Sequence, residues 1–445
     1  MKKFLKVISI LTLAIVTAFG VVACGGDDGA STEKGLLCKK LEDVYTIYKY
    51  VDDGRDSSVL DLAAELEEGV TDVRIKAGAF SGNNTITEII IPDTVTSIDQ
   101  GAFKNMKKLV KITTPFVGAS ANADAEYGDS KAQDKSTGLA RTIGYWFGTS
   151  EYDGGMPITV EYDNGATQTI YVPTTFNQVE VKAEAGYSIP MYAFSGATNL
   201  TTVKLSEGID VIGENAFKGC KNLINVTVPA SVTKIAKNAF YACESLKTET
   251  LFAEDATVSE LGEGAFASTK MDTIVIPASV KVIGNDCFKA SAVKTIYLPS
   301  GLEKIGNYAF YNCAKLSKVY TDGVNGAEMG VYAFAKCESL DYVGEAEGYA
   351  QETIKLGAFS NLGAMSFANI DNGKSYVLVS NFDDQAVSGA FYGTEYVQNL
   401  VVSKGATNPL MFVVLLVGLQ GMIEMVVCTI TGGAVAKGVA AALKK

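Results

Sequence analysis

A repeated Ala-Phe pair, once Cys-Phe, is the feature that most constrains the fold of this 445-residue chain. The repeat phenylalanines are Phe80, Phe103, Phe194, Phe217, Phe240, Phe266, Phe288, Phe310, Phe334, Phe359 and Phe391. Most steps between them are 22 to 26 residues, with one gap of 91 residues and one of 32. An internal period of this length predicts a solenoid, in which each coil buries its apolar side against its neighbours.

Each coil is predicted to contain a short strand after its phenylalanine. Apolar residues recur six, nine and eleven positions later, as Leu223, Val226 and Val228 do after Phe217, and a proline often follows. Alternate residues of a strand face opposite sides, so these apolar residues enter the core. The residues on either side of the middle one form an outward surface, the strand face. Glu249 takes one of the apolar positions, so its coil is predicted to be distorted or shifted in register.

The stretch "NAFKGCKNLINVTVPASVTKIAKNAFYACESL" resembles the BspA-like leucine-rich-repeat family of bacterial surface proteins. The resemblance covers residues 70–115 and 190–402. It implies an α/β leucine-rich-repeat solenoid with a parallel strand on the concave face of each coil of about 23 residues. It also implies an adhesion or interaction module that binds an extracellular protein or a glycan. A structural envelope protein without a specific ligand is the alternative.

The strand face supplies the candidate binding residues. One contiguous patch is predicted from Thr295, Tyr297, Lys318, Tyr320 and Tyr342, and earlier coils add Thr202, Lys204, Asn225 and Thr227. Tyrosine offers broad contact area together with a hydroxyl group, which suits recognition. The alternative interpretation is that aromatic and β-branched residues simply favour strands.

Charge and histidine content narrow the function classes. The chain has 38 Lys and Arg against 50 Asp and Glu, a formal net charge of −12, and an acidic chain repels nucleic acids. It has no histidine, which excludes His-based catalysis and His-ligated metal sites. No phosphate-binding loop or nucleophile elbow is present. We therefore expect no enzyme activity, no cofactor, no metal and no nucleic-acid partner.

The N-terminus has the pattern of an export signal. Lys2, Lys3 and Lys6 precede an apolar stretch, and "VVAC" then ends at Cys24. These four residues resemble the bacterial lipobox, which implies a signal peptide of residues 1–23 and lipid attachment at Cys24. An ordinary signal peptide with a chance cysteine is the alternative. Residues 24–35 are predicted to be a flexible tether, so the protein is expected in the cell envelope, facing outward and anchored to the membrane.

Most of the remaining cysteines follow the repeat. Cys220, Cys243, Cys313 and Cys337 each lie three residues after a repeat phenylalanine, and Cys287 directly precedes Phe288. Such regularity favours core filling by a small apolar side chain. Disulfides between neighbouring coils, Cys220 to Cys243 or Cys313 to Cys337, are the alternative in an exported protein.

Two segments outside the regular repeats have predicted roles. Residues 36–69 form an N-terminal cap, with a short helix that begins at Asp56 or Ser57 and stops at Gly69. Residues 116–189 form a β-rich insertion, in which Asp163-Asn164-Gly165 turns a hairpin. Its aromatic residues are interpreted as anchors on the solenoid, and a binding knob is the alternative; they are Tyr145, Trp146, Phe147 and Tyr152.

The chain ends differently from its body. The main solenoid is expected to span residues 190–405, and an almost wholly apolar segment, 409–430, precedes a tail of residues 431–445. The segment is long enough to cross a bilayer, which needs about 20 residues. A membrane span, a capping helix and an unrelated fused sequence all stay open. We favour the span, which would act as a second anchor.

Overall fold

The computed structural model of the chain describes residues 22–23, 35–52, 54, 57–123, 138–246, 251–321, 327–337, 339–340, 342–344 and 359–360. The chain divides into two compact units, unit 1 up to Lys270 and unit 2 from Met271. Several predictions concern residues outside this part of the chain: the signal peptide up to residue 21, Cys24, the rest of the tether up to residue 34, Glu249, Phe391, the apolar segment 409–430 and the tail.

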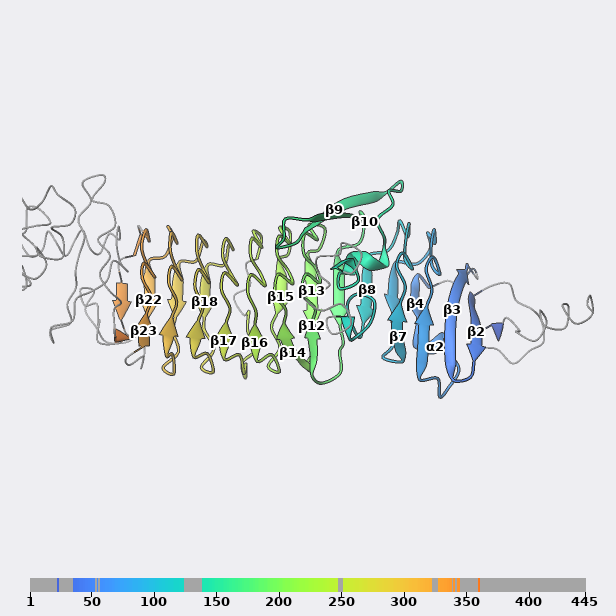
Figure 1. Cartoon of the computed structure of the whole chain (residues 1–445), viewed down its shortest axis with the longest axis horizontal. Helices are drawn as coiled ribbons and strands as arrows, with labels where there is room; N and C mark the ends of the chain where they lie inside the picture. The colour runs from blue at the N-terminus through green and yellow to red at the C-terminus, as the bar shows by residue number, and fades with distance from the viewer. Residues whose placement is uncertain are drawn as a thin grey trace, which may run out of the picture. The chain divides into compact units, whose positions relative to one another are not determined.

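Each unit is a parallel β-solenoid, whose successive coils lie side by side (Figure 1). In unit 1 the strand face is a parallel sheet in the order β15-β13-β11-β8-β6-β4. Its strands are β4 (Val59–Asp61), β6 (Glu88–Ile90), β8 (Lys111–Thr114), β11 (Gln178–Val181), β13 (Thr202–Leu205) and β15 (Asn225–Thr227).

A second row of strands lies on the other side of the coils of unit 1. It contains β5 (Asp72–Ile75), β7 (Val95–Ile98), β12 (Tyr187–Ile189), β14 (Ile209–Ile212), β16 (Lys234–Ile235) and β17 (Glu260–Leu261). β5 pairs with β7, and β12, β14, β16 and β17 pair in that order, all parallel. In the coil that contains Glu249, the described residues pair on the strand-face side only through an isolated bridge between Val228 and Phe252.

Unit 2 repeats the same two rows. Its strand face contains β18 (Thr273–Val275), β20 (Thr295–Tyr297), β22 (Lys318–Tyr320) and β24 (Tyr342–Gly344), all parallel and in chain order. Its second row contains β19 (Val282–Ile283), β21 (Lys304–Ile305), β23 (Ala327–Met329) and β25 (Phe359–Ser360). The solenoid predicted from the repeat is therefore confirmed.

The repeat phenylalanines form the core of each unit. Phe194, Phe217 and Phe240 stack with ring centroids 4.8 and 4.9 Å apart and nearly parallel planes. Phe288, Phe310 and Phe334 do the same in unit 2, at 5.2 and 4.8 Å. One ring per coil at the same position means that every coil covers the ring of the next, which a single coil cannot do alone.

Helix is scarce in the described residues, so the α/β label of the predicted fold class is loose. α2 (Leu62–Glu65) and η1 (Ile143–Trp146), a 3₁₀ helix, each span four residues. Both predicted ends of the first helix were wrong: Asp61 caps α2, its carboxylate accepting the Ala63 N–H at 3.0 Å, and the helix ends at Glu65, before Gly69. The reason is that residues 59–61 form β4 and pair with β6, so the helix begins only after that strand.

The N-terminal segment continues the sheet of the second row. β2 (Gly35–Leu41) and β3 (Val44–Val51) form an antiparallel hairpin, and β3 pairs in parallel with β5. β1 (Val22–Ala23), which the predicted processing before Cys24 would remove, pairs with β2. Cys38 of β2 is buried and disulfide-bonded. Tyr50 of β3 stacks on Phe80, so the hairpin covers the end of the phenylalanine stack.

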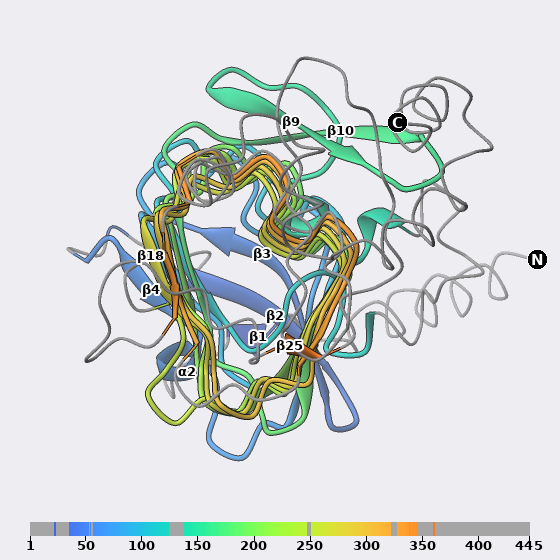
Figure 2. The same cartoon turned by 90° about the vertical axis from the view of Figure 1, so that its left-hand side faces the viewer.

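The segment 116–189 is less of an insertion than the sequence suggests. β11 lies between β8 and β13 in the strand face, and Trp146 of η1 packs edge-on against Phe103. One coil of the solenoid is therefore built from residues in this gap. The true insertion is the antiparallel hairpin β9 (Gly155–Glu161) and β10 (Thr167–Pro173), predicted from its turn, which lies outside the ring of coils (Figure 2).

Candidate functional site

The strand face of unit 2 carries the residues predicted as one binding patch. The register places Thr273, Thr295, Lys318 and Tyr342 in one row, and Val275, Tyr297, Tyr320 and Gly344 in the next. Ile296 and Val319, between the rows, are completely buried. The sheet therefore holds the outward residues on a fixed backbone with a close-packed core beneath it.

An aromatic and aliphatic row is the main feature of this face. The rings of Tyr297 and Tyr320 stack with centroids 4.6 Å apart and planes 24° from parallel. Val275, the preceding residue of the row, is 58% exposed. Lone exposed apolar residues are normal on a surface, but one that continues a tyrosine stack enlarges an apolar surface. Val275 belongs with this patch, although the patch predicted from the sequence omits it.

The neighbouring row is polar. Thr273 and Thr295 are half-buried, whereas Lys318 is exposed. Tyr342 is placed in this row by the pairing of β22 with β24. An apolar row beside hydroxyl groups and an ammonium group can bury a partner's apolar surface and bond to its polar groups. That combination suits recognition.

The predicted residues of unit 1 lie on the separate strand face of that unit. Thr202 pairs with Asn225, and Lys204 pairs with Thr227, on β13 and β15. Lys204, Asn225 and Thr227 are exposed. This part of the face is polar and lacks an aromatic row, so it differs in chemistry from the face of unit 2.

A network of three charged residues lies on the adjoining strands of unit 1. The Lys111 ammonium lies 3.0 Å from a carboxylate oxygen of Glu88 and 3.1 Å from one of Glu180. Burial lowers the pKa of Lys111, but the hydrogen bonds to both carboxylates outweigh it and raise the pKa. Burial raises the pKa of Glu180, but the hydrogen bond to the Lys111 ammonium outweighs this effect, so the pKa of Glu180 is lowered overall. Glu180 lies on β11, inside the segment that the sequence assigned to an insertion, so this network was missed.

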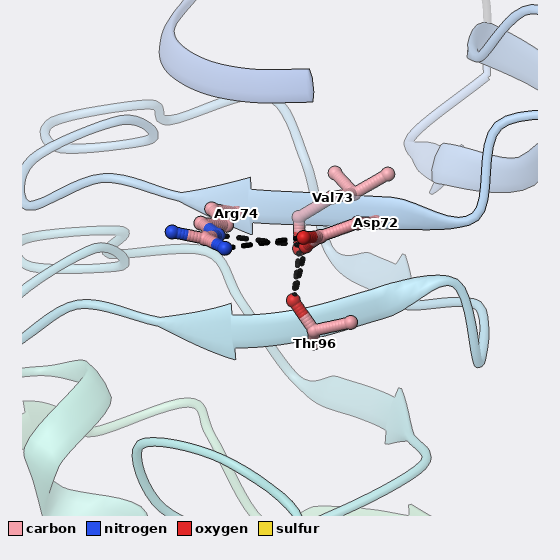
Figure 3. A network of polar contacts seen from close by, with 4 residues as sticks. All are labelled: Asp72, Val73, Arg74 and Thr96. Atoms are coloured by element: carbon pink, nitrogen blue, oxygen red, sulfur yellow. Dashed lines mark hydrogen bonds and ion pairs between the residues drawn. The ribbon is translucent and has the colours of Figure 1, made fainter. Parts of the chain in front are cut away.

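The second row of strands satisfies its polar groups internally. The Asp72 carboxylate accepts hydrogen bonds from the Thr96 hydroxyl at 2.6 Å and from the Arg74 guanidinium at 3.1 Å (Figure 3). These two interactions lower the pKa of Asp72, with the larger effect from Thr96. Lys234 pairs with Glu260 in the next coil at 3.2 Å. The Thr96–Asp72 and Lys234–Glu260 contacts link neighbouring coils, whereas the Arg74–Asp72 contact lies within β5.

The aromatic residues of the insertion are mostly anchors, as predicted. Trp146 and Phe147 are completely buried, and the Trp146 indole N–H donates to the Gly118 carbonyl at 2.6 Å. The Tyr152 hydroxyl donates to the Tyr171 carbonyl at 3.2 Å. Tyr145 is half-buried and lines a hollow of about 650 Å³ with Asp99, Lys104 and Gly101. The hollow is polar and open, and its residues do not select a ligand class.

The repeat cysteines are free thiols in the core, as the core-filling interpretation predicts, and the disulfide alternative was wrong. Each donates to the carbonyl of the repeat phenylalanine one coil back. The pairs are Cys220 to Phe194 at 3.1 Å, Cys243 to Phe217 at 3.2 Å, Cys313 to Phe288 at 3.0 Å and Cys337 to Phe310 at 3.0 Å. Burial raises the pKa of Cys220 and Cys243, so neither is a nucleophile at neutral pH.

Neither metal sites nor membrane spans are found in the described part of the chain. It holds no group of three or more Cys, Asp or Glu side chains that could bind a metal ion. Its helices are too short or too polar to span a membrane.

Comparison with known families assigns the repeat. A family model for the BspA type leucine-rich repeat region matches in six copies, over residues 70–123, 170–292 and 259–387, which together exceed half of the chain. The chain belongs to the BspA-type leucine-rich-repeat family. The match at residues 170–292 includes β11, in agreement with the place of that strand in the solenoid of this BspA-type protein.

Several solved structures are similar to this BspA-type chain. A T. pallidum leucine-rich repeat protein is 23% identical, with 43% of this chain and 90% of that protein covered and a TM-score of 0.33. A leucine-rich repeat protein from Bacteroides ovatus is 19% identical, with coverage of 73% and 82% and a TM-score of 0.34. A leucine-rich cell surface protein from Faecalibacterium prausnitzii is 15% identical, with coverage of 76% and 100% and a TM-score of 0.24. No protein with a curated description matches the chain.

Proposed function

We propose that this BspA-type protein is a cell-surface lipoprotein whose solenoid binds an extracellular protein or glycan through the strand face of unit 2. The observation that carries the proposal is the row of Val275, Tyr297 and Tyr320, which combines an exposed aliphatic side chain with two stacked tyrosines. The corresponding row of unit 1 contains one apolar residue, Ile90, and then Glu180, Lys204 and Thr227, with no aromatic residue among its described members. A strand preference alone would favour apolar residues in both units.

The proposed role is binding and not catalysis. The chain has no histidine, and the repeat thiols are buried hydrogen-bond donors in the core. Each strand of this face pairs in parallel with the strand of the neighbouring coil. Such a surface is preorganised for recognition, because the strand pairing leaves little backbone freedom to be lost on binding.

The proposed anchor is a lipid on Cys24, exposed after removal of residues 1–23. It rests on the basic start, the apolar stretch and the "VVAC" sequence. Replacing Cys24 with serine tests it. The full chain is expected in the membrane fraction and to take up radiolabelled palmitate, whereas Cys24→Ser takes up no label. If the variant incorporates label as the wild type does, the lipid is not on Cys24.

A membrane-associated Cys24→Ser variant without label would support the second proposed anchor, the apolar segment 409–430. Because that segment is proposed to hold the chain in the membrane without the lipid, the palmitate label is the decisive readout for Cys24, and fractionation is the readout for the segment 409–430.

Binding is tested by incubating the purified chain with a glycan array and a panel of extracellular matrix proteins. Tyr297→Ala/Tyr320→Ala is expected to lose at least tenfold in affinity for whichever partner binds. Tyr241→Ala is the control, because Tyr241 is an exposed tyrosine, at 39%, that lies at a turn of unit 1 and away from the strand face of unit 2. Circular dichroism on each variant checks that the solenoid is intact.

Two results would contradict the proposal. Equal binding by the wild type and Tyr297→Ala/Tyr320→Ala would remove the strand face of unit 2 as the site. Failure of the intact chain to bind any glycan or matrix protein would favour the alternative, a structural envelope protein without a specific ligand.

A further inference from the structure

In every regular coil, the residue two positions before the repeat phenylalanine has a left-handed backbone. We call this position the corner of the coil. Glycine, asparagine or aspartate occupies it in most coils, as at Gly101 (φ 74°), Asn215 (φ 55°) and Asp286 (φ 53°). These residues tolerate positive φ best. Three coils instead place a tyrosine there: Tyr192 (φ 62°), Tyr308 (φ 57°) and Tyr332 (φ 57°). A bulky residue in this conformation is strained and is expected only where its side chain has a use.

Tyr192 shows what such a corner tyrosine does. Its side chain is buried, and its hydroxyl accepts the backbone N–H of Asp163, in the turn of the β9–β10 hairpin, at 3.1 Å. Its ring meets that of Tyr162 edge-on at 5.0 Å. Asn215, the corner residue of the next coil, places its amide nitrogen 3.4 Å from both carboxylate oxygens of Asp163. Two adjacent corners of unit 1 thus hold an acidic turn.

Tyr308 and Tyr332 repeat the arrangement on two adjacent corners of unit 2. Their coils are joined by the hydrogen bond from the Tyr308 N–H to the Val331 carbonyl at 2.9 Å, and their rings stack at 5.4 Å. Tyr311 meets the ring of Tyr308 edge-on at 5.5 Å. Tyr308 is 37% exposed, whereas Tyr192, beneath its hairpin, is 3% exposed. The same type of corner therefore stands open to solvent in unit 2.

The local charge around these rings is opposite in sign to the net charge of the chain. The Lys289 ammonium lies 5.8 Å from the ring centroids of both Tyr308 and Tyr311, and that of Lys336 lies 5.4 Å from Tyr311. Asp286 pairs with Lys289 at 2.8 Å. Among the residues that the structure describes, two lysines and one aspartate meet at these rings, a positive local balance, although the chain carries −12. A negatively charged partner is favoured.

The ring geometry favours a protein loop over a sugar. A sugar ring binds to the open face of an aromatic ring. Here the faces and edges of Tyr308 meet Tyr332, Tyr311 and the Lys289 ammonium. What the corner offers is hydroxyl groups next to ammonium groups. These match the backbone N–H and the carboxylate of an acidic turn, the two groups that Tyr192 and Asn215 bind in unit 1.

We propose that the corner formed by Tyr308, Tyr311 and Tyr332 with Lys289 and Lys336, the Tyr308 corner, binds an acidic β-turn of a partner protein. The turn docks as residues 162–163 dock on Tyr192: tyrosine hydroxyls accept backbone N–H groups, and the lysines pair with the carboxylate. This site is on a different part of the coil from the strand face and does not depend on the function proposed for that face.

The test uses the full chain and a fluorescent cyclic peptide with the sequence of residues 158–170, ITVEYDNGATQTI. Anisotropy is expected to show saturable binding that weakens with salt. A peptide with asparagine in place of the aspartate is expected to bind at least fivefold more weakly. In Tyr308→Asn/Tyr332→Asn each corner gains the residue found at Asn215 and Asn238, which suits the backbone. This variant is expected to keep its melting temperature and to lose at least tenfold in affinity.

Two further variants keep the outcome decisive. Lys289→Gln/Lys336→Gln leaves the tyrosines in place and is expected to lose at least fivefold in affinity. Tyr297→Ala/Tyr320→Ala, which alters only the strand face, is expected to bind the peptide as the wild type does. The proposal is overturned if the peptide does not bind the wild-type chain or binds all variants alike. Tyr308-dependent binding of a heparin fragment, but not of the peptide, would also overturn it and make the corner a glycan site.

Discussion

The carbonyl oxygen of Thr159, in the β9 strand of the hairpin, occupies the place that a Cβ atom on Gly196 would need. Gly196 has a φ of +71° and lies two residues after Phe194, the repeat phenylalanine of the coil that begins the main solenoid. The hairpin therefore rests directly on the backbone of a coil, next to the point where Tyr192 accepts the Asp163 N–H. Glycine is required here for two reasons, its left-handed conformation and the absence of a side chain.

Gly196→Ala is expected to destabilise unit 1 by about 2–4 kcal/mol, since the left-handed conformation costs about 1–2 kcal/mol and the overlap adds to it. The hairpin should lift from the solenoid, which limited proteolysis would detect as cleavage within residues 155–173. Gly219→Ala is the matched control, because Gly219 has a similar φ of +73° but its added Cβ would meet nothing closer than 3.9 Å. Equal losses of stability in both variants would mean that the contact with Thr159 is unimportant.

The stack of Tyr297 on Tyr320 is expected to couple the two residues by about 0.5–1.5 kcal/mol, the usual range for an aromatic pair. Urea denaturation of Tyr297→Ala, Tyr320→Ala and the double variant measures this in a double-mutant cycle. Val275→Ser, in the same row but outside the stack, is expected to change stability by less than about 0.5 kcal/mol. A coupling of zero would show that the rings pack no better together than apart.

Lys111→Met is expected to cost about 1 kcal/mol at pH 7, because Glu88 and Glu180 then share a surface without their cation. The pKa of Glu180 is lowered by Lys111 in the folded chain, so the stabilisation is present above its ordinary value of 4.5 and is lost as the pH falls below it. The difference in melting temperature between wild type and variant should therefore shrink between pH 5 and pH 3.

Lys182→Met is the control for that experiment, because Lys182 lies 3.8 Å from Glu180 and its side chain is 61% exposed. Its effect is expected to be smaller at every pH. A difference between wild type and Lys111→Met that does not change with pH would show that Lys111 acts through packing of its alkyl chain and not through its charge.

The repeat thiols are expected to resist alkylation in the folded chain. Cys220 and Cys243 are fully buried, each donates to a carbonyl of the neighbouring coil, and burial raises the pKa of both. Iodoacetamide at pH 8 should leave them unmodified over hours, as peptide mass spectrometry would show, and should modify both in guanidinium chloride. Rapid modification without denaturant would mean that the coils open locally on that timescale.

The repeat itself could be predicted because a coil is a local unit. The phenylalanine and the apolar positions six, nine and eleven residues later define the same strand and corner each time, so Leu223, Val226 and Phe240 could be assigned to the core from spacing alone. The hairpin turn at Asp163-Asn164-Gly165 was equally local. The coil within residues 116–189 was not predicted, because its strand, β11, and its corner, η1, are separated from each other by the hairpin.

The candidate sites divide in the same way. The sequence by itself determined which residues lie on the strand face, since alternation along a strand fixes the side of each residue. Only the tertiary structure decided which of them meet: that Tyr297 stacks on Tyr320, that Lys111 lies between Glu88 and Glu180, and that Tyr308 and Tyr332 form one open corner. These contacts join residues more than twenty positions apart, and their geometry depends on how coils stack rather than on the order of residues within a coil.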